Sequence, residues 1–276
     1  MKYLSKLFTV IILLSFATIS CEDNNSTEPQ ITYLLISERN SGMVYILDIE
    51  SGDLAELSIF TLDTEDTVSG IRGMTYSPET NSLYAGQNTN AGGMIFQLDG
   101  SQRTATLFND NSNELGAMEW YGISDMTYMP NGELHATTWD MVLDNPVITR
   151  FNVDGTRGES VEFGAGGPCC GLGLAALGDN YIVGDWRQFH EIDPEGNVLK
   201  TELLSGTFTP SIDLTATFVQ NFTWIDDVLY TLVFDANNQQ TYVAILDPES
   251  GELTQVSEVI MGRYHGLTAV PDLAFR

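Results

Sequence analysis

The sequence predicts an all-β fold made of five similar units, and three observations support this prediction. Similar pentapeptides recur with their central residues 45 to 52 residues apart. A turn motif that combines Asp or Asn with Gly recurs at a similar spacing. Helical periodicity is absent, and the apolar runs are short, β-branched or aromatic, and bounded by turn residues. A repeat of about 49 residues is typical of a small β-sheet repeated around a circle.

Each pentapeptide is interpreted as the inner strand of one unit. The central residues are Met74, Met126, Leu174, Phe222 and Leu267. A second apolar run follows each of the first four, at 82–86, 133–138, 181–185 and 228–234. The fifth has no such partner after it, so we expect its partner to lie at the other end of the domain.

The turn motif shows where that partner lies. The segment 47–54 is nearly repeated as 246–253, with looser copies at 98–100, 152–155 and 193–197. Asp and Asn bond their own backbone in such turns, and Gly accepts positive φ. The first turn has no inner strand before it. We therefore predict a five-bladed β-propeller of four-stranded blades, closed by the C-terminal strand pairing with the N-terminal strands; a six-bladed propeller is the alternative.

The first thirty residues predict where the protein is located in the cell. Lys2 and Lys6 precede a short apolar stretch, 7–17, which is too short to span a bilayer as a helix. The Thr-Ile-Ser sequence before Cys21 resembles the lipobox of bacterial lipoproteins, although Thr18 replaces the usual Leu. The resemblance implies a signal peptide over 1–20 and acylation of Cys21. A polar tether over 21–30 and a propeller over 31–276 would follow.

A signal peptide and an acylated Cys21 predict that the protein is located in the cell envelope of a Gram-negative bacterium. It would be lipid-anchored at the outer membrane or cell surface. The acidic residues after Cys21 resemble sorting signals of surface-exposed lipoproteins. The formal net charge is −27, which excludes nucleic acid as a partner because binding it needs a basic face. The acidity is typical of a solubilising surface, or of a divalent-cation site such as one for Ca²⁺.

We expect the binding site where loops converge on the propeller axis. The loops entering the inner strands and those leaving the second strands share one face. They carry acids, amides, aromatic residues and arginines suited to sugars or acidic groups. The candidate residues are Arg72, Asp125, Trp139, Asp140, Asp185, Trp186, Arg187, Asn221, Asp235 and His265.

Two adjacent cysteines lie just ahead of the inner strand centred on Leu174. Outside the cytoplasm Cys169 and Cys170 are expected to oxidise, and flanking glycines would permit the tight turn of a vicinal disulfide. Such a disulfide would form a rigid apolar platform beside a ligand. A merely structural turn, or reduced thiols, is the alternative.

The repeat also resembles, loosely and without their motif, the regucalcin and gluconolactonase type of extracytoplasmic propeller. That resemblance implies a channel site in which acids and an Asn hold a metal. No nucleophile or metalloprotease motif is present, and no catalytic residue is predicted. We therefore expect a binding module for a glycan, another small molecule or a protein. A hydrolase or lactonase using axial carboxylates, with or without Ca²⁺, is the second hypothesis, and a structural scaffold is the third.

Overall fold

The computed structural model describes residues 32–48, 51, 53–62, 66–89, 92–111 and 122–271. These residues are almost entirely β-structure; the one helical turn among them is a short 3₁₀ segment, η1 (Leu214–Ala216). No helix in this part of the chain is long and apolar enough to cross a membrane. Residues 1–30, with Cys21 and the predicted signal peptide and tether, lie outside the described part.

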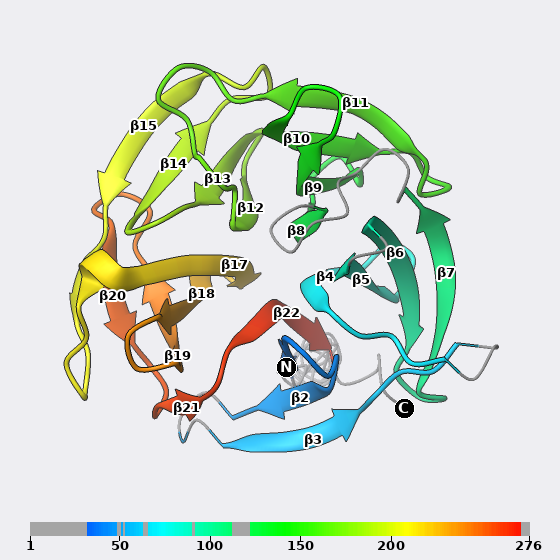
Figure 1. The fold of residues 1–276 in the computed structure, drawn as a ribbon, viewed down its shortest axis with the longest axis horizontal. Coiled ribbons are helices and arrows are strands. Elements are labelled where there is room, and N and C mark those ends of the chain that lie inside the picture. The colour runs from blue at the N-terminus through cyan, green and yellow to red at the C-terminus, as the bar shows by residue number, and fades with distance from the viewer. Residues whose placement is uncertain are drawn as a thin grey trace, which may run out of the picture. The chain divides into compact units, whose positions relative to one another are not determined.

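Five sheets surround a common centre, and each contains a blade of four antiparallel strands, which we count from the axis outward (Figure 1). Blade 1 contains β22 (Tyr264–Pro271), β1 (Thr32–Glu38), β2 (Val44–Leu47) and β3 (Leu54–Ser58). Blade 2 contains β4 (Ile71–Ser77), β5 (Ser82–Thr89), β6 (Gly92–Asp99) and β7 (Thr104–Asp110). Blade 3 contains β8 (Ile123–Tyr128), β9 (Leu134–Asp140), β10 (Asn145–Phe151) and β11 (Arg157–Glu162). Blade 4 contains β12 (Gly173–Leu177), β13 (Asn180–Gly184), β14 (Gln188–Ile192) and β15 (Val198–Leu203). Blade 5 contains β17 (Thr217–Ile225), β18 (Val228–Asp235), β19 (Gln240–Leu246) and β20 (Glu252–Gln255).

Blade 5 departs from the simple pattern at its outer edge. A short strand, β16 (Ser205–Thr207), pairs in parallel with β20, and β21 (Ile260–Met261) pairs with β19. β16 covers the edge that β20 would otherwise leave unpaired, and β21 pairs with the part of β19 that β20 does not reach.

The predicted closure is confirmed. β22 pairs with β1 antiparallel, with Thr32 opposite Pro271 and Glu38 opposite Tyr264. The last strand is thus the innermost member of the first sheet, and the structure holds five blades rather than six. Shared sheets of this kind remove the seam at which a circular array would otherwise open.

Apolar packing between neighbouring blades holds the ring together. The described residues form five large clusters of buried apolar side chains, one at each interface between blades. Leu34 and Ile36 pack toward blade 5, whereas Leu35 between them packs toward blade 2. Because successive side chains of a strand point to opposite faces, one strand serves two interfaces. No blade could bury its own faces alone.

The predicted turns lie between the third and fourth strands of their blades. Asp193 Oδ1 accepts from the Asn197 backbone N–H at 2.8 Å, and Asp247 Oδ1 accepts from that of Glu249 at 2.9 Å. Asp48, Asp99 and Asp154 cap their own turns in the same way. These bonds explain the recurring Asp in the motif, because each replaces a backbone partner within the turn.

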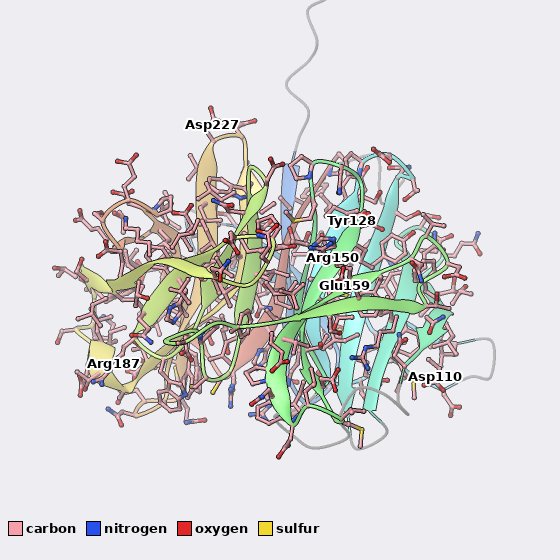
Figure 2. The ribbon with its side chains drawn as sticks, turned by 90° about the horizontal axis from the view of Figure 1, so that it is seen from above. Asp110, Tyr128, Arg150, Glu159, Arg187 and Asp227 are labelled. Carbon is pink, nitrogen blue, oxygen red and sulfur yellow. The ribbon has the colours of Figure 1, made fainter. Side chains whose placement is uncertain are left out.

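We call the end of the axis where the inner strands begin its head, and the end where they finish its tail. Figure 2 shows Asp110 and Arg187 at the head side and Tyr128 and Asp227 at the tail side of the propeller.

Candidate functional site

Two of the predicted axial residues, Asp125 and Asn221, form a buried brace across the head of the axis. Asp125 Oδ1 accepts from Asn221 Nδ2 at 2.9 Å. Its Oδ2 accepts from the backbone N–H groups of Leu174 at 2.8 Å and Phe222 at 3.1 Å. Asn221 Nδ2 also donates to the Arg72 carbonyl at 2.7 Å. One carboxylate therefore joins blades 3, 4 and 5, and its partner extends the connection to blade 2.

Burial dominates the ionisation of this carboxyl group. Asp125 is fully buried, and the loss of solvation raises its pKa to about 8, although the surrounding hydrogen bonds act in the opposite direction. A perturbed pKa is common at catalytic sites, but it also marks structural networks. Both oxygens of Asp125 accept internal hydrogen bonds, so the structure presents this residue as a brace between blades.

A cluster of cationic residues lies at the head of the axis next to this brace. His265 is buried, and its Nε2 has no hydrogen-bond partner among the described residues. Burial lowers the pKa of His265 well below its usual value, and the positive charges of Arg72, Arg263 and Arg39 lower it further. Arg39 and Arg263 are partly exposed and adjacent, because the Arg39 N–H donates to the Arg263 carbonyl at 3.1 Å. Three arginines of a strongly acidic chain thus lie close to one histidine, and Glu38 lies close to Arg39.

Two predicted acids, Asp140 and Asp235, cap turns instead of facing the axis as ligands. Asp140 Oδ1 accepts from the N–H groups of Val142 at 2.7 Å and Leu143 at 2.9 Å, and Oδ2 binds Arg157. Asp235 Oδ1 accepts from the Asn237 N–H at 2.9 Å. Both side chains are almost completely buried. Their carboxylates therefore stabilise the loops that follow the second strands.

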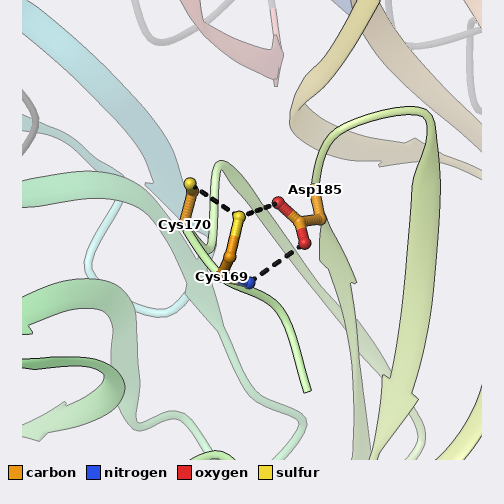
Figure 3. A group of neighbouring side chains, drawn as sticks. All are labelled: Cys169, Cys170 and Asp185. Atoms are coloured by element: carbon orange, nitrogen blue, oxygen red, sulfur yellow. Dashed lines mark hydrogen bonds between the residues drawn. The ribbon is translucent and has the colours of Figure 1, made fainter. Parts of the chain in front are cut away.

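Asp185 occupies the corresponding place in blade 4 but turns toward the two cysteines (Figure 3). Its Oδ2 accepts from the Cys169 N–H at 3.0 Å, and its Oδ1 accepts from Cys169 Sγ at 3.2 Å. Burial alone would raise the pKa of Asp185, but hydrogen bonds from His190 and the Cys169 backbone outweigh it and lower the pKa. Burial raises the pKa of both thiols, and the Asp185 charge adds to the effect.

The cysteine sulfurs are close but not bonded. Cys169 Sγ lies 2.9 Å from Cys170 Sγ, which is longer than the roughly 2.05 Å of a disulfide. The vicinal disulfide stays a prediction.

The two predicted tryptophans make separate contacts. Trp139 Nε1 donates to Asp144 within its own hairpin at 3.3 Å. Trp186, 40% exposed, packs on Phe218 with ring centroids 3.7 Å apart. Phe218 continues to Phe234, and Arg263 lies over both rings. Arg187 is exposed beside Trp186 in a left-handed backbone conformation. The exposed ring of Trp186 thus forms an aromatic surface, and the buried Phe218 and Phe234 continue behind it to Arg263.

The tail of the axis holds a cavity that the sequence did not predict. It has a volume of about 500 Å³, and its lining includes Thr75, Thr127, Thr223 and Thr268 from four inner strands. Tyr76, Tyr128 and Trp224 also contribute to its lining. Glu79 is the one acidic residue among the lining residues. The recurring small residue of the inner strands was the available signal, because a ring of small side chains leaves space at the axis.

No protein-family model and no characterised protein matches the sequence. Solved structures are similar in fold. A chain of the nidogen/laminin complex is 14% identical over 87% of this chain and 98% of that chain, with a TM-score of 0.53. TolB from Acinetobacter baumannii is 12% identical over 87% and 66% of the two chains, with a TM-score of 0.48. The periplasmic gluconolactonase PpgL of Pseudomonas aeruginosa is 13% identical over 87% and 99%, with a TM-score of 0.42.

At these identities the likeness concerns the fold alone. The chain is a five-bladed β-propeller protein whose head carries a cationic cluster, an aromatic surface and a cysteine-carboxylate group.

Proposed function

We propose that the protein is a binding lipoprotein of the cell envelope, without catalytic activity, and that its propeller binds an anionic ligand, an acidic glycan in the first instance, at the head of the axis. The observation that carries the proposal is the convergence of Arg39, Arg72 and Arg263 around His265 in a chain of net charge −27. Guanidinium groups gathered in this way attract an anion to one point of a surface that otherwise repels it.

The aromatic surface supports a carbohydrate as the ligand class. Trp186 is exposed beside the cluster and packed from behind by Phe218, so its ring is held in place. Sugars present C–H faces that stack on such rings, while guanidinium groups bind carboxylate or sulfate substituents in a bidentate manner. An acidic sugar would use both features of the head.

The hydrolase alternative receives less support from the head. Glycosidases need two carboxyl groups flanking the scissile bond. Asp125 braces the blades, Asp140 and Asp235 cap turns, and Asp185 faces Cys169. These four predicted acids are thus committed to contacts inside the protein, which favours binding over hydrolysis.

Calorimetric titration of the full chain in detergent tests the ligand class. The anionic probes are oligogalacturonates, and the neutral probes are xylo-oligosaccharides of equal length. We expect binding of the anionic series only, weakening with added salt. Arg263→Ala should reduce affinity at least tenfold, whereas Arg150→Ala, a substitution in β10 outside the cationic cluster, should not change it. Equal binding of both series, or no binding of the acidic one, would contradict the proposal.

The proposed lipid anchor and the localisation in the cell envelope are tested separately. Metabolic labelling with an alkyne fatty acid should tag the wild-type chain and fail to tag Cys21→Ser. Protease accessibility of intact cells would then distinguish the cell surface from the periplasm. An untagged wild-type chain would refute the anchor without affecting the ligand proposal.

A further inference from the structure

The end of the second strand is a position at which blade 4 differs from blades 1, 3 and 5. Glu38, Asp140 and Asp235 each occupy this position, and each accepts from backbone N–H groups of the loop that follows. Asp185, immediately after β13, accepts instead from a residue sixteen positions earlier in the chain, in the loop that enters the same blade. Its carboxylate is therefore held toward Cys169, and its own turn contributes the Trp186 N–H.

The resulting group has the geometry of a small ligand set. One atom from each of Cys169, Cys170 and Asp185 lies within 4.8 Å of the others. This is the one such group of three or more among the residues that the structure describes. Asp185 is 2% exposed, while Cys169 is exposed and Cys170 partly so. The carboxylate is thus fixed from within, and the thiols are open to solvent.

A second layer of contacts holds the carboxylate in place. The Cys169 backbone N–H donates a hydrogen bond to Asp185 Oδ2, and His190 Nε2 lies 3.8 Å from the same oxygen. His190 is itself fully buried, and its Nδ1 contacts Thr201 Oγ1 at 2.9 Å. Ligating carboxylates are commonly oriented by such outer partners. Oδ1 is left directed at the sulfurs.

The surroundings of the thiols differ from those of a redox centre. Reactive cysteines lie in electropositive surroundings that favour the thiolate. Here a carboxylate faces the sulfur at 3.2 Å, which disfavours an unscreened thiolate. A cation placed between the Asp185 carboxylate and the two sulfurs would replace this repulsion by attraction, because it attracts the carboxylate and both thiolates.

We propose that Cys169, Cys170 and Asp185 bind one thiophilic divalent cation of the zinc type, with a fourth position open to water or to a ligand. Two thiolates favour zinc or cadmium over the calcium considered from the acidic composition. Binding of M²⁺ releases the two thiol protons, and no electron is transferred.

Zinc–sulfur bonds of about 2.3 Å in a tetrahedron require the sulfurs to be about 3.7 Å apart. The two sulfurs must therefore separate by somewhat under 1 Å from their present 2.9 Å. The positive-φ Gly166 and Gly171 flank the pair and leave room for that adjustment.

Cadmium titration of the full chain tests this site. The background is Cys21→Ser, which leaves Cys169 and Cys170 as the only thiols in the sequence. The protein is reduced under anaerobic conditions, and a colorimetric assay must first count two thiols. We expect one Cd²⁺ per chain, with ultraviolet thiolate-to-metal charge-transfer absorption and displacement by Zn²⁺. Cys169→Ser and Cys170→Ser should each abolish the absorption, and Asp185→Asn should weaken binding at least tenfold.

The matched control is Asp235→Asn, which changes the carboxylate at the equivalent position of blade 5 and should leave cadmium binding unchanged. Circular dichroism shows whether each variant is folded. Two titratable thiols without cadmium binding would overturn the proposal. Binding that survives Asp185→Asn unchanged would overturn the ligand set. Neither result depends on the anionic ligand, since no glycan is present in the titration.

Discussion

Asn221 donates a hydrogen bond from Nδ2 to Asp125 Oδ1 at 2.9 Å, joining the inner strands of blades 5 and 3 across 96 residues of sequence. The other oxygen of Asp125 accepts from the backbones of blades 4 and 5. The head of the axis is therefore closed by a polar brace. Such a fully buried carboxylate is stabilising only while its donors and acceptors stay matched.

Asp125→Ala should destabilise the propeller strongly. The substitution would leave the N–H groups of Leu174 and Phe222 buried without an acceptor. Each such group costs about 1–3 kcal/mol, so we expect a loss of about 3 kcal/mol or more in the free energy of unfolding. Urea denaturation measures this loss. Asp179→Ala, at an exposed turn, should change stability by no more than about 0.5 kcal/mol. Similar effects of the two substitutions would show that Asp125 does not brace the ring.

The fold was largely predictable because its signals are local and repeated. The Asp-containing turns and the unpaired last inner strand indicated five blades and their closure. The roles of the axial acids were not predictable in this way. Asp140, Asp185 and Asp235 all lie at the end of a second strand, but their partners differ. Asp125 lies within an inner strand, and its partners are 49 and 97 residues away. The tail cavity could not be predicted because a threonine that lines a cavity and a threonine packed between strands have the same local sequence signal.

The raised pKa of Asp125 predicts a loss of stability at alkaline pH. Burial raises this pKa to about 8, so between pH 4 and 8 the folded state holds a proton that the unfolded state has lost. The stabilisation that results from this proton is complete below the pKa of Asp125 in the unfolded state. It is lost as the pH rises through 8. Between pH 6.5 and 8 we expect a decline of about 1.5 kcal/mol. Asp125→Asn should flatten this decline in urea denaturation, and an unchanged slope would contradict the assignment.

His265 should act in the opposite direction at lower pH. Burial and the charges of Arg72, Arg263 and Arg39 lower its folded pKa well below the usual value. Below pH 6.5 the unfolded state takes up a proton that the folded state refuses, so this contribution is lost as the pH falls. As the pH falls from 6.5 to 5, this loss offsets the gain in the free energy of unfolding that Asp125 provides. His265→Gln should remove the offset, and its stability relative to the wild type should rise as the pH falls. A constant difference between the two proteins would refute this coupling.

The inner strands approach so closely at the head that Gly73 cannot carry a side chain. A Cβ at this position would lie 2.7 Å from Asp125 Cα and 3.0 Å from the Met126 nitrogen, both backbone atoms that cannot rotate away. Gly73→Ala must therefore push blade 3 outward, and we expect a loss of about 1–3 kcal/mol in the free energy of unfolding. Gly164→Ala is the matched control, because the nearest contact of the new Cβ would be the Gly196 carbonyl oxygen at 3.3 Å, and Gly164 lies in a partly exposed loop after β11. That control should stay within about 1 kcal/mol of the wild type. A stable Gly73→Ala protein would show that the blades are spaced more widely around Asp125 than the structure has them.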